Sequence, residues 1–287
     1  MLKETKTLND YPSGSGIEYL DKKFYIIGDD AKDLLILDSN LHSIDSMPLY
    51  SSEEKRIPKP LKADLESVTI TADKKILLLG SGSLAPYRNT GWLIDPITKQ
   101  KDSISFDIFY QRLKESGLPQ INIEGVCSVP GGTILSNRGN KSFPKNHLVF
   151  TNDRFWKEQA SSPITIILMG SNADTAFFNG VSGLCYSAKT DRLILTVSTE
   201  DTRNSTDDGA IGKSYLWIVD DLSSKRNWKA INPDQVIDLE AMDPKLKAQK
   251  IESVCIEKET ANFLHLVLVS DNDDGSTGIF RVLVEKK

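Results

Sequence analysis

The chain has 287 residues, of which 39% are hydrophobic and 26% charged, and its formal net charge is −5. The negative charge argues against a nucleic-acid partner, because phosphate contacts need a basic surface. No apolar run approaches the ~18 residues of a membrane helix, so we expect a soluble protein without a membrane partner. No signal peptide is visible at the start of the chain, and a cytoplasmic protein or a periplasmic one with its leader removed both fit.

A short phrase recurs five times along the chain, at intervals of about 50–70 residues, and apolar stretches follow each copy. The copies begin at Ile17-Glu18, Leu65-Glu66, Ile123-Glu124, Val181-Ser182 and Ile251-Glu252. Four of them carry a glutamate at the position where the fourth copy has serine. Repetition of this kind is typical of small sheets arranged around an axis, which predicts an all-β propeller.

Each repeat can be divided into four strands by apolar alternation and turn residues. The first repeat places them at 17–20, 24–28, 34–37 and 44–49. The last repeat has only three, and residues 3–8 supply a spare strand at the amino terminus. We therefore predict one domain over residues 1–287, a five-bladed propeller whose ring is closed by the N-terminal strand, since an open array would leave unpaired sheet edges. Six blades are the alternative if residues 182–252 contain a degenerate blade.

Three segments do not fit the strand pattern. Residues 51–62 are charged and proline-rich, which predicts a surface connector. Residues 108–115 have helical spacing, and residues 244–250 are expected to form a short helix that begins with Pro244. Each segment precedes an innermost strand, so we expect all three to lie where one blade passes to the next.

Polar residues are expected to converge at one mouth of the central channel, because the first strand of a blade starts where the second ends. Several carboxylates in one place repel each other unless a cation or arginines neutralise them. Oxygen donors of this kind favour Ca²⁺. The candidate metal ligands are Glu18, Glu124, Asn137, Glu252 and Asp271. In the alternatives, the repeated glutamates form a structural latch or a solvated rim, or act directly as acids and bases.

Three arginines lie in the loops that follow the second strands of consecutive blades, namely Arg88, Arg138 and Arg203. They are expected either to clamp a phosphate or carboxylate or to pair with the repeated glutamates. Glu66 and Glu200 lie at the same mouth and complete this candidate ligand-binding set.

Cysteine and histidine offer little for catalysis. Cys127, Cys185 and Cys255 occupy one equivalent position in three repeats, three residues after the repeated glutamate or serine, and we predict buried, unreactive thiols. No histidine falls at the proposed mouth, so a Ser–His–Asp triad is not supported. An enzyme built on this chain would depend on a metal, a carboxylate or an arginine.

The segment from Ile123-Glu124-Gly125-Val126 to Ser136-Asn137-Arg138, together with Ser270-Asp271-Asn272, resembles the phytase-like group of bacterial propellers. That group includes domains with esterase-like activity of phytase and is akin to calcium-dependent lactonase and phosphotriesterase propellers. The resemblance implies a central Ca²⁺ held by Glu18, Asn137 and Asp271-Asn272. The histidines of those enzymes have no counterpart here, and Ser182 breaks the glutamate series.

Two functional hypotheses follow. The first is a calcium-dependent hydrolase of phosphoesters, esters or lactones, with a small anionic or ester ligand at the channel mouth. The second is a non-catalytic scaffold that binds a protein or a carbohydrate.

Overall fold

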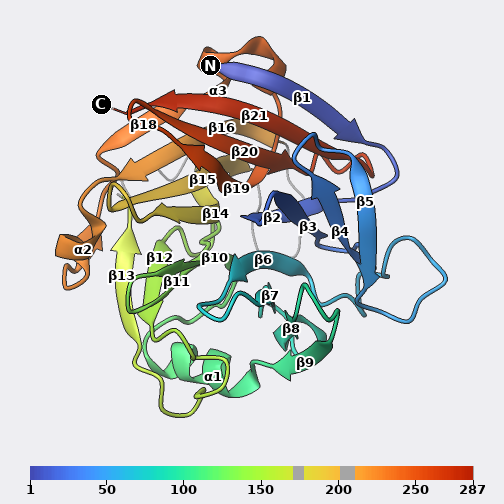
Figure 1. Ribbon diagram of the computed structural model, residues 1–287. Helices are drawn as coiled ribbons and strands as arrows, with labels where there is room; N and C mark the ends of the chain where they lie inside the picture. Colours follow the sequence, from blue (N-terminus) through green and yellow to red (C-terminus); the bar gives the residue numbers. More distant parts are fainter. Residues whose placement is uncertain (171–177, 201–210, 287) are drawn as a thin grey trace.

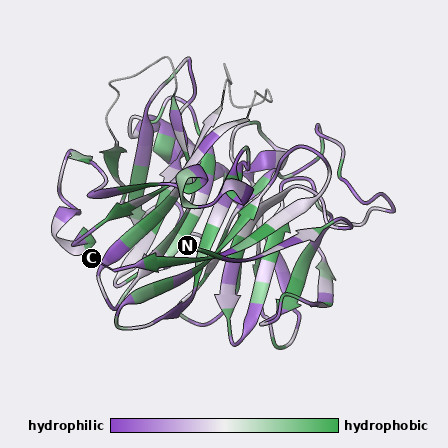
Figure 2. Cartoon of the chain, turned by 90° about the horizontal axis from the view of Figure 1, so that it is seen from above, coloured by the Kyte–Doolittle hydropathy of each residue, from purple (hydrophilic) through white to green (hydrophobic). Residues whose placement is uncertain are grey.

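Five small sheets surround a central channel in the computed structural model, which describes residues 1–170, 178–200 and 211–286 (Figure 1). The first strand of each sheet lies innermost and the following strands extend outward. The predicted five-bladed propeller is confirmed. Loops at the two ends of the ring are mainly hydrophilic, whereas the strands carry most of the hydrophobic residues (Figure 2).

Blades 1 and 2 are antiparallel sheets of consecutive strands. Blade 1 contains β2 (Gly14–Leu20), β3 (Lys23–Gly28), β4 (Asp33–Asp38) and β5 (Ser43–Pro48). Blade 2 contains β6 (Leu65–Ile70), β7 (Ile76–Gly80), β8 (Thr90–Ile94) and β9 (Lys101–Ser105). Every residue of β7 is buried, because the second strand of a blade is covered on both faces by the neighbouring blades.

Blades 3 and 4 are connected by a strand that the sequence did not predict. Blade 3 contains β10 (Ile123–Val129), β11 (Gly132–Asn137), β12 (Asn146–Thr151) and β13 (Thr165–Met169). Blade 4 contains β14 (Asn179–Ser187), β15 (Arg192–Glu200), β16 (Ile211–Val219) and β18 (Gln235–Asp238). Between β16 and β18 the chain adds the short β17 (Ala230–Ile231), parallel to β13, to the outer edge of blade 3.

Blade 5 combines the two ends of the chain. It contains β19 (Ile251–Glu259), β20 (Phe263–Ser270), β21 (Thr277–Glu285) and β1 (Leu2–Leu8). Strand β1 pairs antiparallel with β21, with Leu8 opposite Thr277. The predicted closure by the N-terminal strand is confirmed, and it covers the edge that β21 would otherwise expose.

Helical segments are short. They are α1 (Asp107–Glu115), α2 (Leu222–Lys225), α3 (Leu239–Met242) and the 3₁₀ turns η1 (Tyr87–Asn89) and η2 (Pro244–Leu246). The helix predicted over 108–115 is confirmed as α1, whose Phe109, Tyr110 and Leu113 pack into the cluster between blades 2 and 3. The predicted helix at 244–250 is confirmed only as the single turn η2, which Asp243 caps.

The hydrophobic core is divided among the spaces between adjacent blades. Cys127 packs between blades 3 and 4, Cys185 between blades 4 and 5, and Cys255 between blades 5 and 1. All three thiols are free and buried, as predicted, and burial raises the pKa of each thiol. Tight packing on both faces of every blade keeps the innermost strands in a fixed register around the channel.

Candidate functional site

Each innermost strand contains a β-bulge near its beginning, and in blades 2 to 5 the repeated sequence phrase is this bulge. The extra residue is Ser15, Glu66, Glu124, Ser182 or Glu252 in blades 1 to 5. A bulge re-aims the side chain of its unpaired residue and is common next to functional sites. The three glutamates lie close enough for Glu124 and Glu252 both to repel the Glu66 carboxylate. The predicted convergence at one mouth is therefore observed for these three residues.

Glu18 is not part of this group. The bulge of blade 1 lies between Gly14 and Gly16, so Ser15 is the counterpart of Glu66, and the alignment on Glu18 was wrong by three residues. Glu18 occupies the same position in its strand as Cys127 and Cys185 do in theirs. With these residues it lines a separate cavity of about 210 Å³ in the channel. Burial raises the pKa of the Glu18 carboxyl to about 7, although the backbone N–H of Tyr19 donates to it at 2.9 Å.

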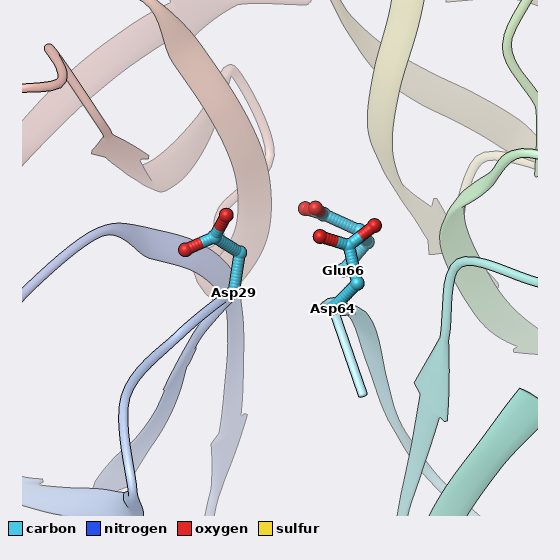
Figure 3. A group of neighbouring side chains, drawn as sticks. All are labelled: Asp29, Asp64 and Glu66. Atoms are coloured by element: carbon cyan, nitrogen blue, oxygen red, sulfur yellow. The ribbon is translucent and has the colours of Figure 1, made fainter. Parts of the chain in front are cut away.

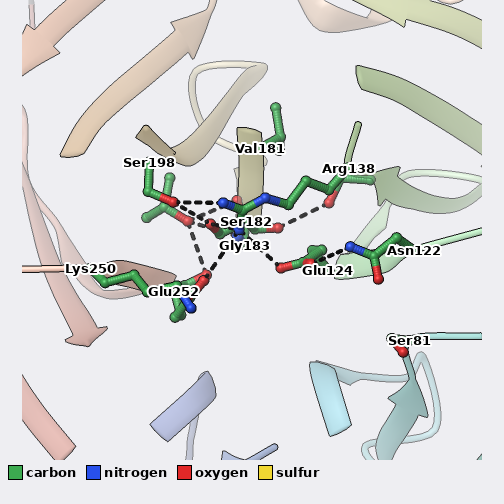
Figure 4. A network of polar contacts seen from close by, with 12 residues as sticks. Ser81, Asn122, Glu124, Arg138, Val181, Ser182, Gly183, Ser198, Lys250 and Glu252 are labelled. Atoms are coloured by element: carbon green, nitrogen blue, oxygen red, sulfur yellow. Dashed lines mark hydrogen bonds and ion pairs between the residues drawn. The ribbon is translucent and has the colours of Figure 1, made fainter. Parts of the chain in front are cut away.

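The glutamates of blades 3 and 5 share one arginine (Figure 4). The Nη1 atom of Arg138 lies 3.4 Å from Oε2 of Glu124 and 3.8 Å from Oε2 of Glu252. The same guanidinium donates to the hydroxyls of Ser182 at 3.2 Å and Ser198 at 3.1 Å. We call these five residues the Arg138 network. Its charged side chains are about nine-tenths buried, so Arg138 offsets a repulsion that water would screen only weakly.

The remaining oxygens of both glutamates also have partners. The side-chain amide of Asn122 donates to Oε1 of Glu124 at 2.6 Å. The Nζ atom of Lys250 lies 2.9 Å from Oε1 of Glu252. The protein itself therefore neutralises both carboxylates, which matches the latch alternative for this part of the mouth.

The serine that interrupts the glutamate series makes room for Arg138. The guanidinium of Arg138 crosses from blade 3 to blade 4 and donates to the hydroxyl of Ser182 at 3.2 Å (Figure 4). Gly180 allows this crossing, because a Cβ atom there would lie 2.3 Å from Nε of Arg138. In blade 4, the serine that replaces the repeated glutamate therefore binds the side chain of Arg138 from blade 3.

On the other side of the mouth, three carboxylates approach one another (Figure 3). Asp29, Asp64 and Glu66 each contribute one carboxylate oxygen to a group in which no two oxygens are more than 4.8 Å apart. We call these three residues the Glu66 cluster. Such spacing is close to that of oxygen ligands around a single hard cation.

Two basic side chains contact the Glu66 cluster from the side of its aspartates. Lys62 forms ion pairs with Asp29 and, at 2.8 Å, with Asp64. Arg88 donates through Nη1 to Oδ2 of Asp64 at 2.6 Å. Lys62 and Arg88 are 8% and 5% exposed, so their positions are fixed by the surrounding protein. They orient the aspartates, and neither forms an ion pair with Glu66.

Glu66 differs from the four carboxylates that have a cationic partner at this mouth, which are those of Asp29, Asp64, Glu124 and Glu252. Among the described residues it accepts no hydrogen bond and forms no ion pair. Burial raises its pKa well above the usual range, and the charges of Glu124 and Asp64 raise it further. Burial also raises the pKa of Asp29, although Lys62 opposes this effect. With three carboxylates and two cations, the cluster and its partners carry one uncompensated negative charge.

The other predicted site residues have different surroundings. Asn137 is wholly buried; its Oδ1 accepts from the backbone N–H of Asn122 at 2.8 Å and its Nδ2 donates to the carbonyl of Gln120. It therefore holds residues 120–122 in place, and the structure does not bring it into the Glu66 cluster. Asp271 lines a neighbouring cavity with Asp29. The side chain of Glu200, at the end of β15, and all of Arg203 lie outside the described residues.

Arg138 pairs with two of the repeated glutamates, which is the second of the two roles expected for the arginines, whereas Arg88 pairs with Asp64 instead. A three-arginine anion clamp stays a prediction, because it requires Arg203.

Comparison with known proteins places the sequence in a family. Residues 10–284 match the model of a family of unknown function, DUF6929. The chain belongs to this family. No curated protein matches the sequence. In the described part of the chain, no helix has the length and apolarity needed to span a membrane.

One solved structure supports the propeller fold of this DUF6929 member, and a second shows a weaker likeness. Glutaminyl cyclase from Myxococcus xanthus superposes with a TM-score of 0.58 at 9% identity, covering 100% of this chain and 97% of that one. Virginiamycin B lyase from Staphylococcus aureus gives a TM-score of 0.46 at 12% identity, covering 97% and 100%. At these identities the likeness concerns the fold alone. The resemblance to phytase-like propellers is thus supported as a propeller fold, and the likeness to that group in particular stays a proposal.

Sequence reasoning missed Asp64 and Lys62. Asp64 stands two residues before Glu66, just ahead of the bulge, so its position relative to the repeat was a usable signal. Lys62 lies at the end of the segment predicted as a surface connector. Nothing in its neighbours indicates that the side chain turns inward and is only 8% exposed.

Proposed function

We propose that the channel mouth binds a divalent cation, Ca²⁺, at the Glu66 cluster, and that this centre hydrolyses an ester bond of a small ligand. The observation that carries the proposal is the Glu66 carboxylate. It is half-buried, it has no partner among the described residues, and it faces two further carboxylates within 4.8 Å. A buried carboxylate without a partner destabilises the fold unless a cation binds it or it takes up a proton.

The donor set favours calcium over softer metals. All three side chains offer oxygen, and neither histidine nor cysteine joins the cluster. Ca²⁺ accepts six to eight oxygens, so three carboxylates leave positions for water and for a ligand oxygen. A bound calcium ion would polarise a carbonyl or phosphoryl oxygen and stabilise negative charge that develops on it.

The residues of the chain have separate tasks in this proposal. Glu66, Asp29 and Asp64 bind the ion. Lys62 and Arg88 hold the two aspartates in place and limit their repulsion. A divalent ion would change the formal charge of this group from −1 to +1, which favours the anionic or ester ligand predicted from the sequence.

Calcium binding can be tested by thermal unfolding and isothermal titration calorimetry. Calcium is expected to raise the melting temperature of the wild type in a concentration-dependent way, because the ion binds the folded state. Glu66→Gln should abolish that increase. The absence of any increase with millimolar calcium would contradict the proposal and favour a non-catalytic scaffold.

Catalysis needs a separate test. Phosphoester, carboxylic ester and lactone substrates are to be compared with calcium and with EGTA, using the wild type and Glu66→Gln. The proposal expects turnover that requires both calcium and Glu66. Calcium binding without turnover of any of the three classes would restrict the site to a binding role.

A further inference from the structure

A cavity of about 440 Å³ opens beside the Glu66 cluster, between blades 1 and 5 and the connector 51–62. Its walls include Asp29, Asp30, Arg56, Lys62 and Asp271. We call it the Asp271 cavity. Asp29 and Lys62 belong both to this wall and to the surroundings of the Glu66 cluster, so the two sites are adjacent. The volume is within the range of small-molecule sites and far exceeds that of a single ion.

Most carboxylates deep in this cavity already have a cationic partner from the protein. Asp29 pairs with Lys62, and Oδ2 of Asp30 accepts from Nε of Arg56 at 2.6 Å. The Oδ1 atoms of both aspartates are buried and lack hydrogen bonds. The cavity therefore has more acceptor oxygens than the donors around it satisfy.

Asp271 is the exception. It is 7% exposed, and among the described residues it forms no ion pair. Within the described part of the chain, Asp271 accepts a single hydrogen bond, from the backbone N–H of Asp273 to Oδ1 at 2.9 Å. The nearby ammonium group of Lys250 contacts Glu252 instead. Burial and, to a smaller extent, the charge of Asp29 raise the pKa of Asp271 to about 7, although the charge of Lys250 opposes this shift. A buried carboxyl that borders a cavity and lacks a cation is suited to bind one from a ligand.

We propose that the ligand of this propeller carries a protonated amino group, which Asp271 binds in the cavity next to the Glu66 cluster. The inference rests on the proposed function, because the ester group of the ligand is placed at the proposed calcium ion. The substrate class is then an ester or phosphoester that bears an amino group. Binding of the amino group itself does not require calcium.

The test uses two probes of equal size, ethanolamine and ethylene glycol, which differ in one ammonium group. Each is titrated in EGTA into the wild type, Asp271→Asn and Asp153→Asn, while the backbone amide signals of residues 271–273 are followed by NMR. Asp271→Asn keeps the shape of the side chain and removes its charge. Asp153→Asn is the matched control, because Asp153 is exposed and lies outside this cavity.

Ethanolamine is expected to saturate the wild type and the control with a dissociation constant of roughly 1–10 mM, since four heavy atoms permit little more. Asp271→Asn should weaken this binding at least tenfold, and ethylene glycol should bind at least tenfold more weakly than ethanolamine. Equal binding of both probes, or no saturation by about 100 mM ethanolamine, would overturn the inference. The probe comparison uses the wild type, so it stays decisive even if Asp271→Asn fails to fold.

The two proposals fail in different ways. Calcium binding without ethanolamine binding would overturn the amine inference alone. Ethanolamine binding without any calcium effect would overturn the calcium centre and leave the amine site in place.

Discussion

Glu66 and Glu124 occupy the same bulged position in adjacent blades, yet their surroundings are opposite. Both oxygens of Glu124 face donors, namely Asn122 and Arg138. Glu66 faces Asp64 and Asp29 and has no donor among the described residues. The same local backbone therefore gives a neutralised carboxylate in blade 3 and an unpaired one in blade 2. The comparison shows that the residues flanking the bulge, Asn122 and Arg138 in blade 3 and Asp64 in blade 2, decide which glutamate is available to a ligand.

We expect the largest effect from replacing Arg138, the arginine that pairs with Glu124 and Glu252. Arg138→Met would leave Glu124 and Glu252 buried without their shared cation, and we expect the free energy of unfolding to fall by about 3–5 kcal/mol. Urea denaturation measures this change. Arg154→Met, at an exposed position, is the control and should change stability by less than about 0.5 kcal/mol. A loss in Arg138→Met as small as that of the control would show that the Arg138 network is not a stabilising latch.

The second effect contrasts the two glutamates directly. Calcium at about 100 times its dissociation constant should stabilise the wild type by about 2.7 kcal/mol. Glu124→Gln should keep this gain and lose about 1–3 kcal/mol whether or not calcium is present, because a buried hydrogen-bonded charge is removed. Glu66→Gln should lose the gain. It should also be more stable than the wild type in EGTA, since the raised pKa of Glu66 reflects a destabilised charge. Melting curves with calcium and with EGTA decide between these outcomes; a calcium response lost in Glu124→Gln but kept in Glu66→Gln would reverse our assignment.

A third, smaller effect tests how Arg138 reaches blade 4. Gly180→Ala places a Cβ atom against Nε of Arg138 and should cost about 1–3 kcal/mol as the guanidinium is displaced. The same substitution in an Arg138→Met background should cost much less, because the clash is gone. Equal costs in both backgrounds would mean that Gly180 is needed for another reason.

A fourth effect, of about the same size as the third, concerns Glu18, which lies apart from both sides of the mouth. Its pKa of about 7 in the folded state exceeds that of an unfolded glutamate, so the folded protein binds more protons between about pH 4.5 and 7. The free energy of unfolding should therefore fall as the pH rises through this window, and Glu18→Gln should remove that part of the loss. Relative to the wild type, the variant should gain about 1–3 kcal/mol between pH 5 and pH 8. Denaturation at the two pH values checks this; the same difference at both would show that Glu18 titrates normally.

Sequence reasoning located the mouth but misjudged its members. The repeated phrase identified Glu66, Glu124 and Glu252, because each follows an apolar residue at the start of a strand. It failed for Glu18, since the match of Ile17-Glu18 to the phrase is coincidental and the bulge of blade 1 uses Gly14-Ser15-Gly16. The proposed ligand Asn137 could not be judged from its type, because only the fold shows that its amide holds residues 120–122.

The amino-acid sequence by itself determined the architecture: five repeats of strand and turn signals, a last repeat with three strands, and a spare strand at the amino terminus to close the ring. These features follow from local periodicity, which is readable without knowledge of neighbours. Only the tertiary structure decided which carboxylates are paired. Arg138 reaches a different blade and Lys62 turns inward from a loop, and such contacts between distant segments depend on packing that no local pattern encodes.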